Sequence, residues 1–413
     1  MSNAPWGVRL ACRLLQERAK GADSEWAPYL ALVPESVPGS PLLYAEEDVK
    51  ALQYPPAVTE ATEMRDAVSS WHARLSNECA DALAGADLDA FKAAVSVVHS
   101  RTYGIASGDG SGEGYFRALL PLADLLNHGG DEYDDSSVAA VDSTIDGTPT
   151  VAAVDSTIDG TPTVAAAVPS KWPPSRCVDN IAWSELGDDG FVSFSATRDV
   201  VAGEEALMSY GERSNDHFLM YYGFVPPRNP HDDVIVFADV DHALSWHMVY
   251  HPELWEGGGD DEAAVRERAA RAAVASVEKS LGDGGDGALA RSEPRLKVLP
   301  GGRCDARLIS LFAAAYAGTE GAQDAGSGGQ LARVDVDSAH ADVARRCEEL
   351  LRAMPTTIAE DDDLLSAAAE SAPGGGDGGG VADATRSAIA YRRHKKVVLE
   401  DAIECLGGGG GEA

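Results

Sequence analysis

Four short segments carry side chains whose types and spacing could support chemistry. The first, Leu120–His128, is an apolar run that contains an acid, an amide and an imidazole at Asp124, Asn127 and His128. Polar groups in an apolar run need hydrogen-bond partners, because burying them unpaired costs free energy. This pattern indicates either a polar site at the end of the run or an ordinary helix end with Asn127 as its cap.

The other three segments place a guanidinium group and aromatic rings beside turns. They are Ser100–Tyr103 with Arg101, Gly203–Gly211 with Tyr210, and Ser214–Phe224 with Tyr222 and Phe224. Tyrosines near glycines are more often core or turn residues than catalysts, and Arg101 alone would as readily pair with a surface acid. Ser214 is a suitable N-cap for a short helix.

Composition and charge limit the partners of the chain. Its 413 residues contain 33 Lys and Arg against 67 Asp and Glu, a formal net charge of −34, with an ordinary hydrophobic fraction of 44%. No basic patch stands out, so we expect no nucleic acid partner. The longest uncharged stretch, 308–319, has twelve residues, whereas a membrane span needs about twenty, so we expect no membrane partner. The acidic charge favours basic protein surfaces.

The cysteines indicate the compartment. The six lie far apart, with no C-x-x-C pair, a spacing that speaks against a zinc site and a disulfide scaffold and fits a reducing environment. Residues 1–10 lack a basic stretch followed by an apolar core, so no secretory signal is visible. We expect an intracellular protein, in the chloroplast or in the cytoplasm or nucleus, with no metal centre. The oligomeric state stays open.

Periodicity and turn signals predict the elements that must position these segments. Helices are predicted at 6–19, 46–52, 59–83, 88–99, 261–281, 305–317, 339–354 and 385–405, and strands at 181–183, 191–195 and 232–237. The thirteen residues 139–151 are repeated identically at 152–164, which predicts that 129–174 is a surface insertion. A boundary near residue 238 separates a mixed half from an all-helical half.

In this order, the four segments resemble those of the SET-domain protein methyltransferases. The subfamily is that of the Rubisco large-subunit lysine methyltransferase and the actin histidine methyltransferase. The resemblance rests on two stretches, PLADLLNH at residues 121–128 and GEEALMSYGERSNDHFLMYYGF at residues 203–224. The stretch 355–365 and the basic final helix are similar to that subfamily's substrate-binding domain. The family's cysteine-rich zinc segment is absent, which fits the Rubisco-type branch.

The resemblance implies an α+β fold and a cofactor. Residues 1–237 would form the SET domain, with 1–100 as a helical insert, and 238–413 a helical substrate-binding domain. The cofactor would be S-adenosyl-L-methionine and the substrate a protein that presents a lysine. Tyr210 and Tyr222 match the catalytic channel tyrosines. The positions that match cofactor-binding residues are Arg101, Asp124, Asn127, His128, Tyr210 and Phe224.

One departure from the family pattern leaves alternatives open. Members begin with strands that carry a Gly-x-Gly motif, whereas this sequence opens at what resembles the helical insert, and the motif is expected to be missing. The leading hypothesis is a protein-lysine N-methyltransferase. The alternatives are a non-catalytic SET remnant that binds a protein, and a protein-histidine methyltransferase. We expect no doubly wound parallel sheet, because no strand–glycine loop–helix unit occurs.

Overall fold

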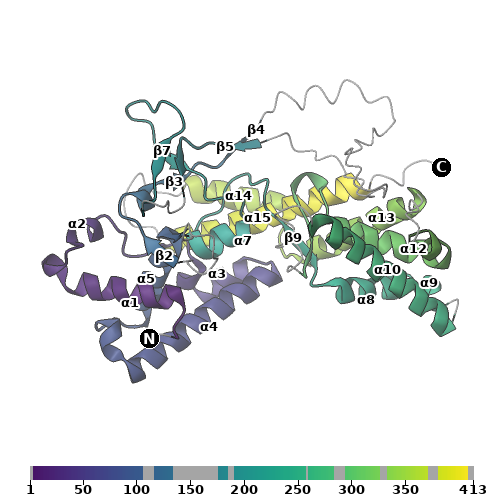
Figure 1. The fold of residues 1–413 in the computed structure, drawn as a ribbon, viewed down its shortest axis with the longest axis horizontal. Helices are drawn as coiled ribbons and strands as arrows, with labels where there is room; N and C mark the ends of the chain where they lie inside the picture. Colours follow the sequence, from purple (N-terminus) through teal and green to yellow (C-terminus); the bar gives the residue numbers. More distant parts are fainter. Residues whose placement is uncertain are drawn as a thin grey trace. The chain divides into compact units, whose positions relative to one another are not determined.

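A computed structural model describes residues 3–105, 116–133, 175–184, 190–256, 259–282, 294–325, 333–370 and 380–407 (Figure 1). The chain divides into two compact units that interleave along the sequence. Unit 1 comprises 1–133, 175–229 and 356–394, and unit 2 the remainder. No helix within the described ranges is long and apolar enough to span a membrane.

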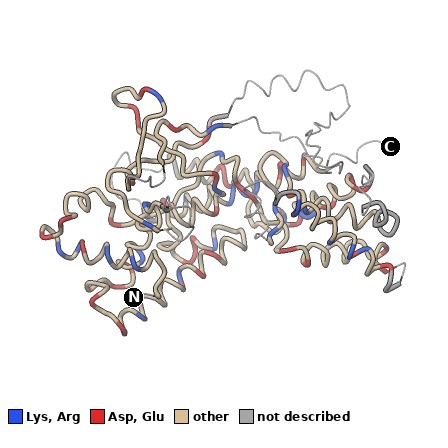
Figure 2. Tube along the Cα trace, in the orientation of Figure 1, with Lys and Arg blue, Asp and Glu red and all other residues tan. Residues whose placement is uncertain are grey.

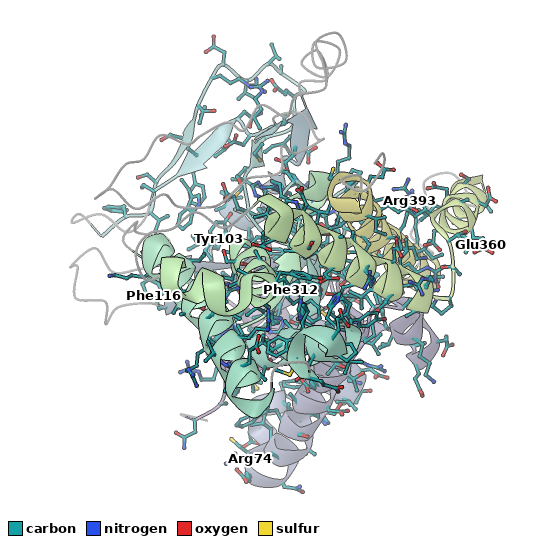
Figure 3. The ribbon with its side chains drawn as sticks, turned by 90° about the vertical axis from the view of Figure 1, so that its right-hand side faces the viewer. Arg74, Tyr103, Phe116, Phe312, Glu360 and Arg393 are labelled. Atoms are coloured by element: carbon teal, nitrogen blue, oxygen red, sulfur yellow. The ribbon has the colours of Figure 1, made fainter. Side chains whose placement is uncertain are left out.

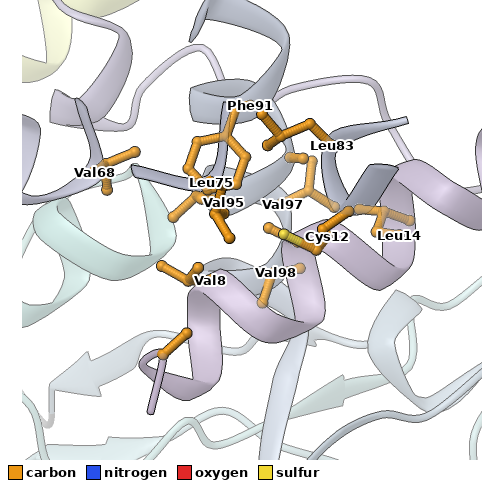
Figure 4. Packing of buried hydrophobic residues seen from close by; sticks show 14 of the residues in the cluster. Val8, Cys12, Leu14, Val68, Leu75, Leu83, Phe91, Val95, Val97 and Val98 are labelled. Carbon is orange, nitrogen blue, oxygen red and sulfur yellow. The ribbon is translucent and has the colours of Figure 1, made fainter. Parts of the chain in front are cut away.

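The N-terminal part of unit 1 is helical. Its helices are α1 (Trp6–Ala19), η1 (Gly21–Asp23), α2 (Ala27–Leu30), η2 (Pro41–Leu43), α3 (Glu46–Ala51), α4 (Pro55–Glu78), η3 (Ala80–Leu83) and α5 (Leu88–Arg101). In α1, Val8 and Cys12 are one helical turn apart and buried, so they present a single apolar stripe. That stripe packs against Val95 and Val98 of α5 (Figure 4). Asp87 caps α5 by accepting from the Ala90 amide at 2.9 Å.

The rest of unit 1 is built from short paired strands. They are β1 (Thr102–Ile105), β2 (Phe116–Leu119), β3 (Asn127–His128), β4 (Asp131–Tyr133), β5 (Ser175–Cys177), β6 (Ile181–Trp183), β7 (Phe194–Ala196) and β8 (Leu207–Met208). The pairs β1–β2, β4–β5 and β6–β7 are antiparallel, and β3–β8 is parallel. Between and after them lie η4 (Ala123–Leu125), α7 (Asn215–His217) and the π-helical η6 (Phe218–Tyr222).

Two helices complete unit 1 from the far end of the sequence. They are α14 (Ile358–Glu370) and the first part of α15 (Gly380–Gly407). Arg392 on α15 pairs with the fully buried Asp361 on α14 at 2.7 Å, and the neighbouring Arg393 pairs with Asp362. Arg393 is labelled in Figure 3. Arg392 and Arg393 of this helix are therefore paired with acids of the same unit.

Unit 2 is mostly helical around one two-stranded sheet. Its elements are β9 (Val234–Phe237), α8 (Val240–Tyr250), α9 (Pro252–Glu256), α10 (Gly259–Gly282), β10 (Leu296–Val298), η7 (Pro300–Gly302), α12 (Ala306–Ala325), α13 (Arg333–Ala353) and the end of α15. Phe237 and Phe312 lie in its core, with ring centroids 5.8 Å apart. Lys395 is fully buried and pairs with the equally buried Asp232 at 2.8 Å.

The predicted fold class, an α+β protein with a helical C-terminal region, is confirmed. The helices predicted at 6–19 and 88–99 match α1 and α5, whereas α8 and α14 were not predicted. The tandem repeat and most of the 129–174 insertion lie outside the described residues. Only 129–133 of the insertion is described, and β4 within it pairs with β5, which begins directly after the insertion. The boundary at residue 238 stays a prediction; the two compact units cut the chain elsewhere.

Candidate functional site

Five aromatic and imidazole rings from the predicted segments form one cluster in unit 1. The His128 ring lies 5.3 Å from Tyr210, 4.9 Å from Phe218 and 6.3 Å from Phe224, measured between ring centroids. Tyr210 lies 4.8 Å from Tyr222 and 6.4 Å from Phe224. Residues almost a hundred positions apart in sequence therefore share one aromatic surface.

Pairing of β3 with β8 produces this convergence. Asn127 aligns with Leu207 and His128 with Met208, so the two motifs leave the sheet side by side. Directly after β8, the Tyr210 amide donates to Nδ1 of His128 at 3.3 Å. Asn127 is therefore part of a strand, and the interpretation of this residue as a helix cap is wrong.

The position of the phenol of Tyr210 is fixed by a backbone acceptor. Its hydroxyl donates to the carbonyl oxygen of Leu126 at 2.8 Å. Burial, followed by the neighbouring Tyr222, raises the pKa of Tyr210 to about 12. The group therefore stays protonated at physiological pH, and its oxygen lone pairs can still accept a hydrogen bond.

A π-helical turn brings Tyr222 and Phe224 to the same cluster. Ser214 caps α7 by accepting from the His217 amide at 3.4 Å, as predicted. The helix continues as the wider π-helical turn η6. This turn is capped by Gly223, whose φ of +75° lies in the left-handed region. A Cβ there would lie 2.6 Å from Cγ1 of Val37, so only glycine allows this close approach. Single π-turns are frequent at functional sites.

Asp124 and Arg101 meet at the polar side of the cluster. Nη1 of Arg101 donates to the Asp124 carbonyl oxygen at 2.8 Å and lies 3.5 Å from its Oδ2. Tyr29 donates to the same Oδ2 at 2.7 Å. Tyr103 donates to the Ala123 carbonyl oxygen at 2.8 Å. With Tyr210, which binds the Leu126 carbonyl oxygen, four side chains thus hold the loop 123–126.

Asn127 differs from its neighbours because it is exposed. Its amide donates to Oε1 of Glu205 at 2.6 Å, and Glu205 is exposed as well. Next to Glu205, Glu204 pairs with Arg198 and also accepts from the Val201 amide, and these donors lower its pKa to about 2. Acidic groups thus line this end of the β3–β8 pair.

The comparisons with known proteins relate this chain to others by its fold. No family model and no curated protein matches the sequence. Among solved structures, the SET domain of LSMT bound to lysine and AdoHcy matches with a TM-score of 0.54 and 16% identity, over 98% of this chain and 75% of that chain. Rubisco LSMT bound to AdoMet matches over the same shares with a TM-score of 0.53. The chain therefore shares the fold of these SET-domain structures. The predicted SET-type fold is confirmed, and the subfamily stays a prediction.

Within this SET fold, the structure brings the predicted site residues together. Arg101 and Asp124 meet the aromatic cluster through the loop 123–126, and Asn127 lies at its exposed end. The sequence reasoning missed Tyr29 and gave Tyr103 no role. Tyr103 closes the motif that contains Arg101, so proximity in sequence was a usable signal for it. For Tyr29, a tyrosine in a proline-rich connector, the sequence offers no signal.

Away from the aromatic cluster, the described residues of unit 2 bring together one group of metal-ligand residue types. His247, His251 and Asp342 place one ligand atom each within 4.8 Å of one another. Nδ1 of His247 accepts from the Trp255 indole N–H at 3.0 Å. Since an indole can only donate, the proton of the neutral imidazole lies on Nε2, the atom that faces Asp342 at 3.6 Å. This geometry describes a hydrogen-bonded hub, in which Tyr316 also donates to Asp342.

Proposed function

We propose that the protein is an S-adenosyl-L-methionine-dependent protein-lysine N-methyltransferase. The observation that carries the proposal is the fixed Tyr210, held by the Leu126 carbonyl oxygen and by His128 and flanked by Tyr222 and Phe224. The SET fold and the cofactor-bound forms of the matching structures support the same chemistry.

The residues of the site fit the proposed cofactor. Its adenine needs an aromatic face, which the half-buried ring of Phe224 can provide, with the buried Phe218 behind it at a ring distance of 5.1 Å. Its amino-acid end carries an ammonium group, and Asp124 holds a buried carboxylate oxygen, Oδ1, without a hydrogen-bond partner among the described residues. Asn127 would supply amide groups and His128 a fixed ring beside them. When bound, the cofactor supplies a methyl group on a positively charged sulfur.

The chain's own contribution to the reaction is positioning. Methyl transfer needs the amine nitrogen in line with the methyl–sulfur bond. A site that holds this geometry lowers the barrier, because the entropy of aligning the two groups is lost on binding and not in the reaction step. The Tyr210 hydroxyl donates its hydrogen to the Leu126 carbonyl oxygen. Its own oxygen is therefore left to accept an N–H of the amine, which orients the nitrogen lone pair. Tyr222, with its ring 4.8 Å away, limits the width of the channel.

The amine must also lose its proton before it attacks. Burial disfavours the charged ammonium, and a nearby cation disfavours it further. The aromatic walls provide the first effect, and the positive charge on the sulfur of a bound cofactor would provide the second. A neutral amine is therefore favoured at the point of transfer.

The test uses the full chain in two separate measurements. AdoHcy is titrated by calorimetry, and methyl transfer from radiolabelled cofactor into a protein lysate is followed by amino-acid analysis. Binding together with radiolabelled methyllysine is the expected result. Radiolabelled methylhistidine would replace the lysine assignment by the histidine alternative. A chain that neither binds AdoHcy nor transfers the label would contradict an enzyme and favour the non-catalytic, protein-binding alternative.

A further inference from the structure

Asp124 has one carboxylate oxygen that is held and one that is not. Its side chain is 0% exposed. Oδ2 accepts from Tyr29 at 2.7 Å and lies 3.5 Å from Nη1 of Arg101, whereas Oδ1 has no hydrogen-bond partner in the described part of the chain. A desolvated carboxylate oxygen without a donor is costly, and buried polar atoms in native proteins are nearly always paired. The arrangement therefore calls for a further donor at Oδ1.

The location of Asp124 ties this oxygen to the candidate site. Ala123 and Leu126, on either side of Asp124, give their carbonyl oxygens to Tyr103 and Tyr210. Burial raises the pKa of both tyrosines, and the charge of Asp124 raises each further. Asp124 therefore acts directly on the groups that would surround the reacting amine.

Tyr29 reaches Asp124 from a remote part of unit 1. It lies on the four-residue helix α2, 95 positions earlier in the sequence, and packs partly buried against the N-terminal core. Burial, with the hydrogen bond to Asp124 as the next cause, raises the pKa of Tyr29. Its hydroxyl thus remains a donor at any physiological pH. The helical insert in this way contributes one side chain to the site.

We propose that Tyr29 is a positioning residue: with Arg101 it holds Oδ2 of Asp124, so that Oδ1 can accept a hydrogen bond from an ammonium group. This inference rests on the proposed function. An ammonium offers three donors and a full positive charge, the best match for a single desolvated carboxylate oxygen. Two groups in the reaction carry this chemistry, namely the amino-acid end of the cofactor and the substrate lysine as it arrives protonated.

The experiment compares wild type with Tyr29→Phe, which keeps the ring and removes the hydroxyl. AdoHcy affinity is measured by calorimetry, and apparent KM and kcat by methyl transfer with the protein lysate as the methyl acceptor. If the ammonium belongs to the cofactor, AdoHcy affinity falls about tenfold, the effect of weakening one charge-assisted hydrogen bond. If it belongs to the substrate, KM rises about tenfold while AdoHcy affinity and kcat stay near wild type. Either result supports the positioning role.

Two further variants separate positioning from general stability. Tyr250→Phe removes another phenol–carboxylate contact, to Glu349 in unit 2, and should leave affinity and KM unchanged. In an Asp124→Asn background, Tyr29→Phe should add less than twofold to the loss, because it acts through Asp124. If the losses of Tyr29→Phe and Asp124→Asn are additive, or if Tyr29→Phe equals an active wild type in affinity and KM, the positioning role is overturned and the proposed function stands. A wild type without binding or transfer overturns it together with the proposed function.

Discussion

At the scale of single residues, the site is organised by donors that hold backbone carbonyl oxygens. Tyr103, Arg101 and Tyr210 each bind a carbonyl in the loop 123–126. Their residue types marked the motifs in the sequence, but the acceptors could not be predicted, because backbone carbonyls carry no sequence signal. Tyr29 was missed for a related reason. Its partner lies 95 positions away, beyond the reach of any local periodicity.

The first prediction concerns Tyr210. Tyr210→Phe removes the hydroxyl that orients the amine but keeps the ring that packs against Tyr222, so turnover should fall by about 10²–10³. AdoHcy affinity should stay within twofold. Tyr221→Phe is the matched control, because this tyrosine belongs to the same π-helical turn but stacks on His217, with ring centroids 4.7 Å apart. Radiolabel transfer and calorimetry measure both variants; undiminished transfer by Tyr210→Phe would remove it from the catalytic role.

At the scale of elements, helices with a clear apolar period were predictable, whereas α14 and the two-residue strands were not. The apolar spacing of α1 and α5 gave both helices nearly residue by residue. Helix α14 was missed although the sequence carries its start signal, a capping box. Thr357 and Glu360 exchange side-chain to backbone hydrogen bonds of 2.8 and 3.2 Å. The two-residue strands β3 and β8 are too short for any alternating pattern to mark them.

The second prediction tests the close approach that places Tyr222 and Phe224. Gly223→Ala adds a Cβ at a φ of +75°, 2.6 Å from Val37 Cγ1 and 2.9 Å from the Ser40 amide nitrogen. The backbone conformation and the clash together should lower the free energy of unfolding by about 2–4 kcal/mol. Gly203→Ala is the control, because its φ is +91° with nothing within 4 Å of the added Cβ, and it should cost about 1 kcal/mol. Urea unfolding followed by tryptophan fluorescence compares them; equal losses would contradict the close-packing account.

At the scale of the whole molecule, ion pairs and hydrogen bonds join residues that lie far apart in the sequence. Acidic and basic residues are interspersed along the helices of both units (Figure 2), and the basic run of α15 is paired internally through Arg392 and Lys395. The sequence showed a basic helix but not these acids, since Asp361 and Asp232 lie 31 and 163 positions away. For the same reason, the grouping of 356–394 with the N-terminal part was not predictable: Thr385 binds Asp48, 337 positions earlier.

The third prediction is the acid sensitivity of the whole fold. Three histidines are held neutral mainly by burial, which lowers the pKa of His99 and His217 to about 4 and that of His247 to about 3. Arg117 adds to the first two and His251 to the third. In the unfolded chain a histidine binds its proton near pH 6.5. Between these values the unfolded state holds more protons, so stability is complete above about pH 6.5 and is lost as the pH falls toward 4.

His99→Gln tests this linkage. Each such histidine contributes a slope of up to about 1.4 kcal/mol per pH unit to the free energy of unfolding, and the variant should flatten the dependence by about one such increment between pH 6 and 4.5. His242→Gln, an exposed position, should leave the slope unchanged. Because the net charge of −34 also changes in this range, both series are measured at low and high salt. Screening weakens surface repulsion but hardly affects the protonation of a buried ring. A slope that vanishes in high salt, or that His99→Gln leaves intact, would assign the acid sensitivity to net charge instead of to the buried histidines.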